Sequence, residues 1–174
     1  MALDSLMQVR HGSCMLGELG SGRRTIVEAL AKAHEKLYEK TINRFFIDQD
    51  DNTDNPDKGI SDWGDSCMRV EDIYGSFDSE ENWKDGCLSA AIRQCNNDDT
   101  NLIVIKGGAN PPIMELMNTV LDDNKLLTLA SGDRIPLGKN TRVVYLLEHC
   151  NNLSPATVSR MGFIKVNPED VDFK

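Results

Sequence analysis

The sequence contains no apolar run that approaches the roughly 20 residues a membrane-spanning helix needs. Its hydrophobic fraction of 40% with 27% charged residues is ordinary for a soluble globular protein. The N-terminus also lacks the basic start and apolar stretch of a secretory signal. We therefore expect a cytoplasmic protein with no membrane partner, and its 174 residues suffice for one domain with its own core.

Cysteine pairs and excess positive charge are missing as well. The five cysteines include no CxxC pair, which disfavours a zinc site and indicates reduced, structural thiols. The net charge of −9 would repel a phosphate backbone, so we expect no nucleic-acid partner.

The stretch from Asp48 to Ser66 is too rich in aspartate, among Asn, Gly and Pro, to pack into a core. It predicts a mobile surface insertion at 49–66. An EF-hand calcium loop is excluded, because the sixth position counted from Asp48 is Thr53 instead of Gly and the twelfth is Gly59 instead of Glu.

Apolar runs and helical spacing predict alternating strands and helices. The expected strands are Cys14–Leu16, Arg44–Asp48, Leu102–Ile105, Arg142–Leu147 and Gly162–Val166, with a hairpin inside Leu126–Leu137. The expected helices are Thr25–Tyr38, with a buried stripe at Ile26, Ala29, Leu30, Ala33 and Leu37, then Asn82–Gln94, Pro112–Leu121 and a short one from Pro155 to Arg160. This alternation predicts a doubly wound parallel sheet that binds ligands at the carboxyl ends of its strands.

The turn after the first strand, GELGSGRRT, has the glycine skeleton of a phosphate-binding loop but not its chemistry. In the pattern GxxxxGK[ST], Lys reaches the terminal phosphates and the hydroxyl holds Mg²⁺. Arg23 and Arg24 stand at these two positions, and Lys106 stands where an acidic residue should follow the strand Leu102–Ile105. We expect no Mg²⁺ or other metal, and at most weak binding of ATP or ADP as a metal-free anion. The candidate nucleotide-binding residues are Gly17, Gly20, Ser21, Gly22, Arg23, Arg24 and Thr25.

Two long strings, MNTVLDDNKLLTL (Met117 to Leu129) and SPATVSRMGFI (Ser154 to Ile164), resemble the second AAA+ module of dynein heavy chains. Shorter strings support the resemblance in the same order along the chain: RHG, IYGSFD, WKDGCLS and SGDRIPL. The resemblance implies that 1–174 is an AAA+ large α/β subdomain, a P-loop NTPase-like three-layer αβα sandwich with a five-stranded parallel sheet. The C-terminal helical lid is expected to be absent, because the chain stops at Lys174.

In that family the second module holds nucleotide structurally and lends an arginine to the neighbouring first module. The family's SR pair maps onto Ser159 and Arg160, so the resemblance implies that Arg160 is an arginine finger. Glu148 aligns with the polar sensor after the fourth strand. The implied partners are the adjacent AAA+ modules of a dynein ring and, indirectly, microtubules, in the cytoskeleton or in a cilium or axoneme.

Two other hypotheses remain beside a non-hydrolysing ring module. An active small P-loop ATPase would require the metal-holding hydroxyl, the acidic third strand and a catalytic base. A nucleotide-free scaffold derived from a truncated dynein gene would keep the fold without the function.

Overall fold

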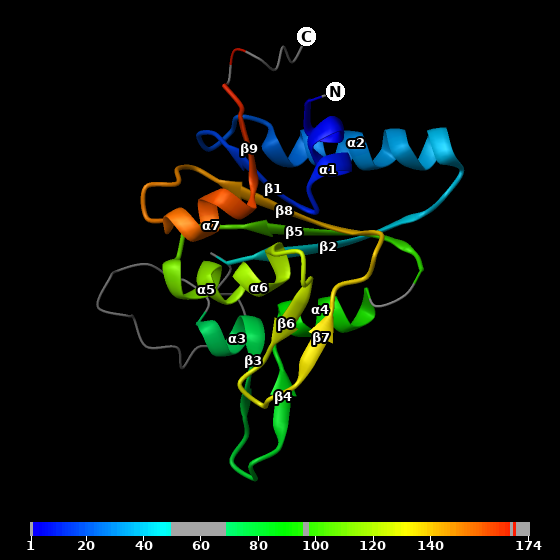
Figure 1. Ribbon diagram of the computed structural model, residues 1–174. Coiled ribbons are helices and arrows are strands. Elements are labelled where there is room, and N and C mark those ends of the chain that lie inside the picture. Colours follow the sequence, from blue (N-terminus) through cyan, green and yellow to red (C-terminus); the bar gives the residue numbers. More distant parts are fainter. Residues whose placement is uncertain (1, 50–68, 96–97, 168, 170–174) are drawn as a thin grey trace.

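Five parallel strands form the sheet on which the rest of the chain is built (Figure 1). The computed structural model describes residues 2–49, 69–95, 98–167 and 169. The strand order is β2-β5-β8-β1-β9, and every neighbouring pair is parallel. The bounds are β1 Gly12–Leu16, β2 Ile42–Asp48, β5 Thr100–Lys106, β8 Thr141–Leu147 and β9 Gly162–Lys165. The predicted parallel five-stranded sheet is confirmed.

Alternate residues of the central strands face opposite sides of the sheet, and each side has its own apolar core. In β5, Leu102 and Val104 join Val27 of α2 in one core, whereas Ile103 and Ile105 belong to the other. Figure 1 shows α1 and α2 on the first side and the remaining helices on the second. The helices are α1 Ala2–Val9, α2 Arg23–Tyr38, α3 Val70–Tyr74, α4 Cys87–Gln94, α5 Pro111–Leu116, α6 Asn118–Leu121 and α7 Pro155–Arg160. The three-layer αβα sandwich is therefore confirmed.

The buried face of α2 differs from the predicted stripe. Arg23, Val27 and Ala31 are its buried residues, whereas Leu37 of the predicted stripe is 72% exposed. Ile26 and Leu30 of the predicted stripe are partly buried against this core, so the prediction is correct in part and the centre of the buried face lies at Val27 and Ala31.

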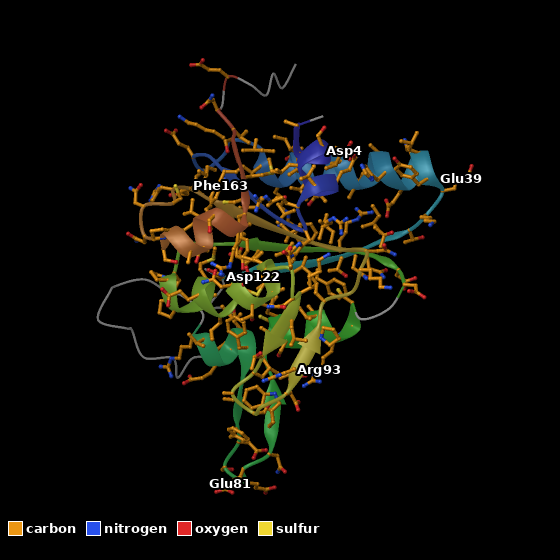
Figure 2. All side chains as sticks on the ribbon, in the orientation of Figure 1. Asp4, Glu39, Glu81, Arg93, Asp122 and Phe163 are labelled. Carbon is orange, nitrogen blue, oxygen red and sulfur yellow. The ribbon has the colours of Figure 1, made fainter. Side chains whose placement is uncertain are left out.

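Two antiparallel hairpins lie outside the main sheet. The hairpin of β6 (Leu126–Thr128) and β7 (Arg134–Pro136) was predicted and is confirmed. The hairpin of β3 (Gly75–Phe77) and β4 (Trp83–Asp85) was not predicted, and it projects from the body of the molecule, with Glu81 near its tip (Figure 2).

The predicted helix over Asn82–Gln94 is wrong in its first part. Trp83–Asp85 form β4, and α4 begins only at Cys87. Gly86 is the N-cap residue of α4 and has an extended backbone (φ −81°, ψ 179°), so the helix begins only after it. Glycine is required there, because a Cβ would lie 2.4 Å from the backbone carbonyl carbon of Ile73.

Most of the predicted acidic insertion at 49–66 lies outside the described residues. The expected helix over 112–121 is divided into α5 and α6 at Met117. The described residues contain no helix long and apolar enough to cross a bilayer.

Candidate functional site

The candidate phosphate loop joins the carboxyl end of β1 to the first turn of α2. Gly20 (φ 81°) and Gly22 (φ 79°) take left-handed backbone conformations that favour glycine. The Ser21 amide donates to the Glu18 carbonyl at 3.1 Å, which closes a tight turn. The loop therefore ends at the N-terminus of a sixteen-residue helix, where unpaired N–H groups favour an anion.

Gly17 lies where the loop passes close to the last strand. A Cβ at this residue would lie 2.6 Å from the Val166 carbonyl oxygen and 2.8 Å from Ser21 Oγ. The Gly17 amide donates to Leu147 O at 3.1 Å, which ties the loop to the end of β8. Only glycine fits this close approach, so the predicted glycine skeleton has a structural role at its first position.

Arg23 turns into the loop, and its side chain is buried. The residue is 9% exposed, and its Nη2 donates to the Glu18 carbonyl at 3.3 Å. Its Nη1 is buried with no hydrogen-bond partner among the described residues, and so is Ser21 Oγ. Burying a cationic donor without a partner is costly. The loop thus holds two buried polar groups that have no hydrogen-bond partner among the described residues.

The electrostatic surroundings of Arg23 include Glu148 and Cys14. Burial lowers the pKa of the Arg23 guanidinium, and the charge of Glu148 opposes that shift. Burial raises the pKa of the Cys14 thiol to about 12, with a smaller opposing effect of Arg23. Of the predicted site residues, Glu148, which follows β8, therefore contributes to the electrostatic surroundings of Arg23. Its predicted role as a sensor stays a prediction.

Arg24 and Thr25 lie on the outside of α2. The Arg24 guanidinium bonds Glu28 at 2.9 Å and stands 4.6 Å from the ring centroid of Phe46 on β2. Thr25 is exposed. Arg24 thus stands at the position of the hydroxyl that would hold Mg²⁺, and its side chain contacts Glu28 and Phe46.

Lys106 ends β5, and its Nζ forms an ion pair with Asp48 Oδ2 at 2.7 Å. Asp48 ends β2, and the two residues are register partners. β8 separates β5 from β1 in the sheet. The Lys106 ammonium group therefore faces the outer strand β2. Of the three predicted cations, Arg23, Arg24 and Lys106, only Arg23 turns into the loop.

Arg160 is the last residue of α7 and is held from two sides. Its Nε donates to Asp122 Oδ1 at 2.5 Å, and its Nη1 donates to the Ala156 carbonyl at 2.8 Å. Asp122 follows α6, which packs beside α7 (Figure 2). Ser154 caps the start of α7 as expected, because its hydroxyl accepts from the Thr157 amide at 3.3 Å.

A cleft of about 360 Å³ lies beside the loop at the carboxyl ends of β1, β8 and β9. Glu18 and Glu148 line it together with His149 and Lys165. Glu18 was not among the predicted site residues, although it lies inside the glycine-rich turn. The partners of the predicted cations, Asp48 and Asp122, were not predicted either, because they are distant in sequence.

The residues at the two metal-holding positions of a P-loop do not fit Mg²⁺. The loop offers N–H groups, Ser21 Oγ and Arg23 Nη1, whereas the two positions that hold the metal in P-loop enzymes carry Arg24 and Lys106. Among the described residues, no cluster of three or more His, Cys, Asp or Glu could hold a metal ion.

No protein-family model matches this chain. It is 34% identical over 173 residues to the human dynein axonemal heavy chain 17 and, to the same extent, to the ciliary dynein beta chain of Heliocidaris crassispina. It is 35% identical to the flagellar outer arm dynein beta chain of Chlamydomonas reinhardtii. Each match covers 97% of this chain but only 3–4% of the relative. The chain is therefore a homologue, along nearly its whole length, of one short segment of dynein heavy chains.

Proposed function

We propose that this chain is the large α/β subdomain of the second AAA+ module of a dynein heavy chain, and that it supports the motor ring without hydrolysing ATP. The observation that carries the proposal is the pair of cations in place of catalytic groups. Arg23 is buried in the loop, and Lys106 is paired with Asp48 at the end of β5.

Phosphoryl transfer depends on positioning and on stabilising the charge of the transition state. Removing one such group commonly costs about 3–4 kcal/mol. Arg23 replaces the Lys, Arg24 replaces the hydroxyl that holds the metal, and Lys106 replaces the acidic residue. Three changes of this kind together leave the module without a hydrolytic centre.

The loop retains the donors for an anion. Ser21 Oγ and Arg23 Nη1 are buried and unsatisfied within the described part of the chain, at the N-terminus of α2. We propose that this loop binds the phosphate group of ATP or ADP weakly and without Mg²⁺.

Arg160 acts outside its own module in this proposal. It stabilises negative charge on a nucleotide held by the neighbouring first module. The partners are the adjacent AAA+ modules and, through the whole motor, microtubules. Relatives named axonemal, ciliary and flagellar support a place in the cytoskeleton of a cilium or axoneme.

Phosphate release from ATP by the purified chain, with Mg²⁺ and with a chelator, tests the proposal. The matched control is Arg23→Ala, purified in the same way, because a contaminating ATPase would appear equally in both preparations. We expect equal release from both proteins. Mg²⁺-dependent release by the wild-type chain above that of the variant would instead favour an active small P-loop ATPase.

A further inference from the structure

Three segments far apart in the sequence meet at Arg160. Arg10 precedes β1, Asp122 follows α6, and Arg160 ends α7. The Nη1 of Arg10 donates to the carbonyls of Ser159 at 3.1 Å and of Arg160 at 3.4 Å. These carbonyls belong to the last turn of α7, where helix carbonyls have no partner within the helix. The Arg10 side chain therefore holds the main chain at the end of α7.

The side chain of Arg160 is held separately from its backbone. A guanidinium is planar and presents its donors in a rigid fork. Asp122 accepts from Nε and the Ala156 carbonyl accepts from Nη1. With two of the three nitrogens held, the plane of the group is fixed and so is the direction of Nη2. Within the described part of the chain, Nη2 has no hydrogen-bond partner.

Asp122 is itself fixed by its backbone. Its amide donates to the Asn118 carbonyl at 3.0 Å, and its carbonyl accepts from the Lys125 amide at 3.0 Å. The carboxylate is about one-third exposed, like the arginine it bonds. A carboxylate on a rigid turn can set the orientation of a guanidinium more sharply than one on a mobile loop.

We infer that Asp122 is a positioning residue for the proposed arginine finger: it holds Nε of Arg160 so that Nη2 is presented to an anionic group on a neighbouring module. The inference rests on the proposed function of Arg160. The pair uses Nε and leaves the two N–H groups of Nη2 without an acceptor among the described residues. A small misplacement of such a group can cost about 100-fold in rate.

Kinetics of the native polypeptide that contains this segment and the adjacent modules test the inference. We expect Asp122→Asn to lower kcat for ATP by about 10- to 100-fold, with little change in KM, and Asp122→Glu to recover part of the loss. The matched control is Asp123→Asn, an exposed neighbour with the same change of charge, which should behave as the wild type. In an Arg160→Ala background, Asp122→Asn should have no further effect.

Two outcomes would overturn the inference. One is a kcat for Asp122→Asn equal to that for Asp123→Asn, and the other is an equal loss of kcat from Asp122→Asn in the presence and in the absence of Arg160. A wild-type rate for Arg160→Ala would refute the finger itself. The geometry is then tested in the 174-residue chain by NMR. The Nε–H of Arg160 should exchange slowly with solvent in the wild type and quickly in Asp122→Asn but not in Asp123→Asn. Equal exchange in all three would contradict the positioning role whatever the function of Arg160.

Discussion

Lys106 and Asp48 lie opposite each other at the carboxyl ends of β5 and β2, and their side chains form an ion pair at 2.7 Å. An acidic residue at the end of β5 would serve a metal in a P-loop enzyme. In this chain the carboxylate stands one strand further out, where the lysine neutralises it. The pair thus links the outer strand β2 to β5.

Reversing one charge of this pair should weaken the sheet edge. Lys106→Asp places two carboxylates side by side, so we expect a loss of about 0.5–1 kcal/mol in the free energy of unfolding, small because both groups are partly exposed. The double variant Asp48→Lys/Lys106→Asp restores opposite charges and should recover most of the loss. Urea unfolding measures all three proteins. A double variant no more stable than Lys106→Asp would show that the pair does not contribute.

Replacing Arg23 by Met should stabilise the isolated chain. Met has a helix propensity close to that of Arg, and it removes a buried cation whose Nη1 has no partner in the described structure. We expect the free energy of unfolding to rise by about 1 kcal/mol or more. The control is Arg24→Met, which loses an exposed ion pair and a contact with Phe46 and should slightly destabilise the chain. A lower free energy of unfolding in Arg23→Met would mean that the interactions of Arg23 outweigh the cost of burying its charge.

His11 should make stability depend on pH. Burial lowers its pKa below 6.5, against the opposing effect of the Val120 carbonyl, to which Nε2 donates at 2.9 Å. The unfolded chain therefore takes up a proton first as the pH falls, so the stability present above pH 6.5 is lost progressively below it. Unfolding midpoints at about pH 7.5 and about pH 5.5 should differ less in His11→Gln than in the wild type. An unchanged difference would assign the pH dependence to other groups.

The strands of the main sheet could be predicted from the sequence because they are short apolar runs bounded by polar residues. β5 is the plainest case, since Leu102 to Ile105 are buried on both faces. The glycine-rich turn between β1 and α2 could also be located, because its glycines stand out in the sequence, and Gly20 and Gly22 take left-handed conformations in the structure. Its role as a phosphate loop stays a prediction. α1 was missed, although its single buried residue, Leu3, anchors it to the sheet.

The partners of the charged site residues could not be predicted. Arg160 lies 38 residues from Asp122 and Lys106 lies 58 residues from Asp48, so no local pattern connects them. The orientation of the Arg23 side chain could not be predicted either, because a long side chain at a helix N-terminus can turn inward or outward. Tertiary packing, which buries Arg23 and leaves Arg24 exposed, decides between two adjacent arginines.

The most direct test of the account is a calorimetric titration of the chain with ADP, with and without Mg²⁺. The proposed site is an anion site made by the loop, Ser21 Oγ and Arg23 Nη1, with Arg24 and Lys106 at the two positions that hold the metal in P-loop enzymes. The account predicts weak binding of the same affinity with and without Mg²⁺, and loss of that binding in Arg23→Ala. Binding that is strengthened by Mg²⁺, or that survives unchanged in Arg23→Ala, would contradict it.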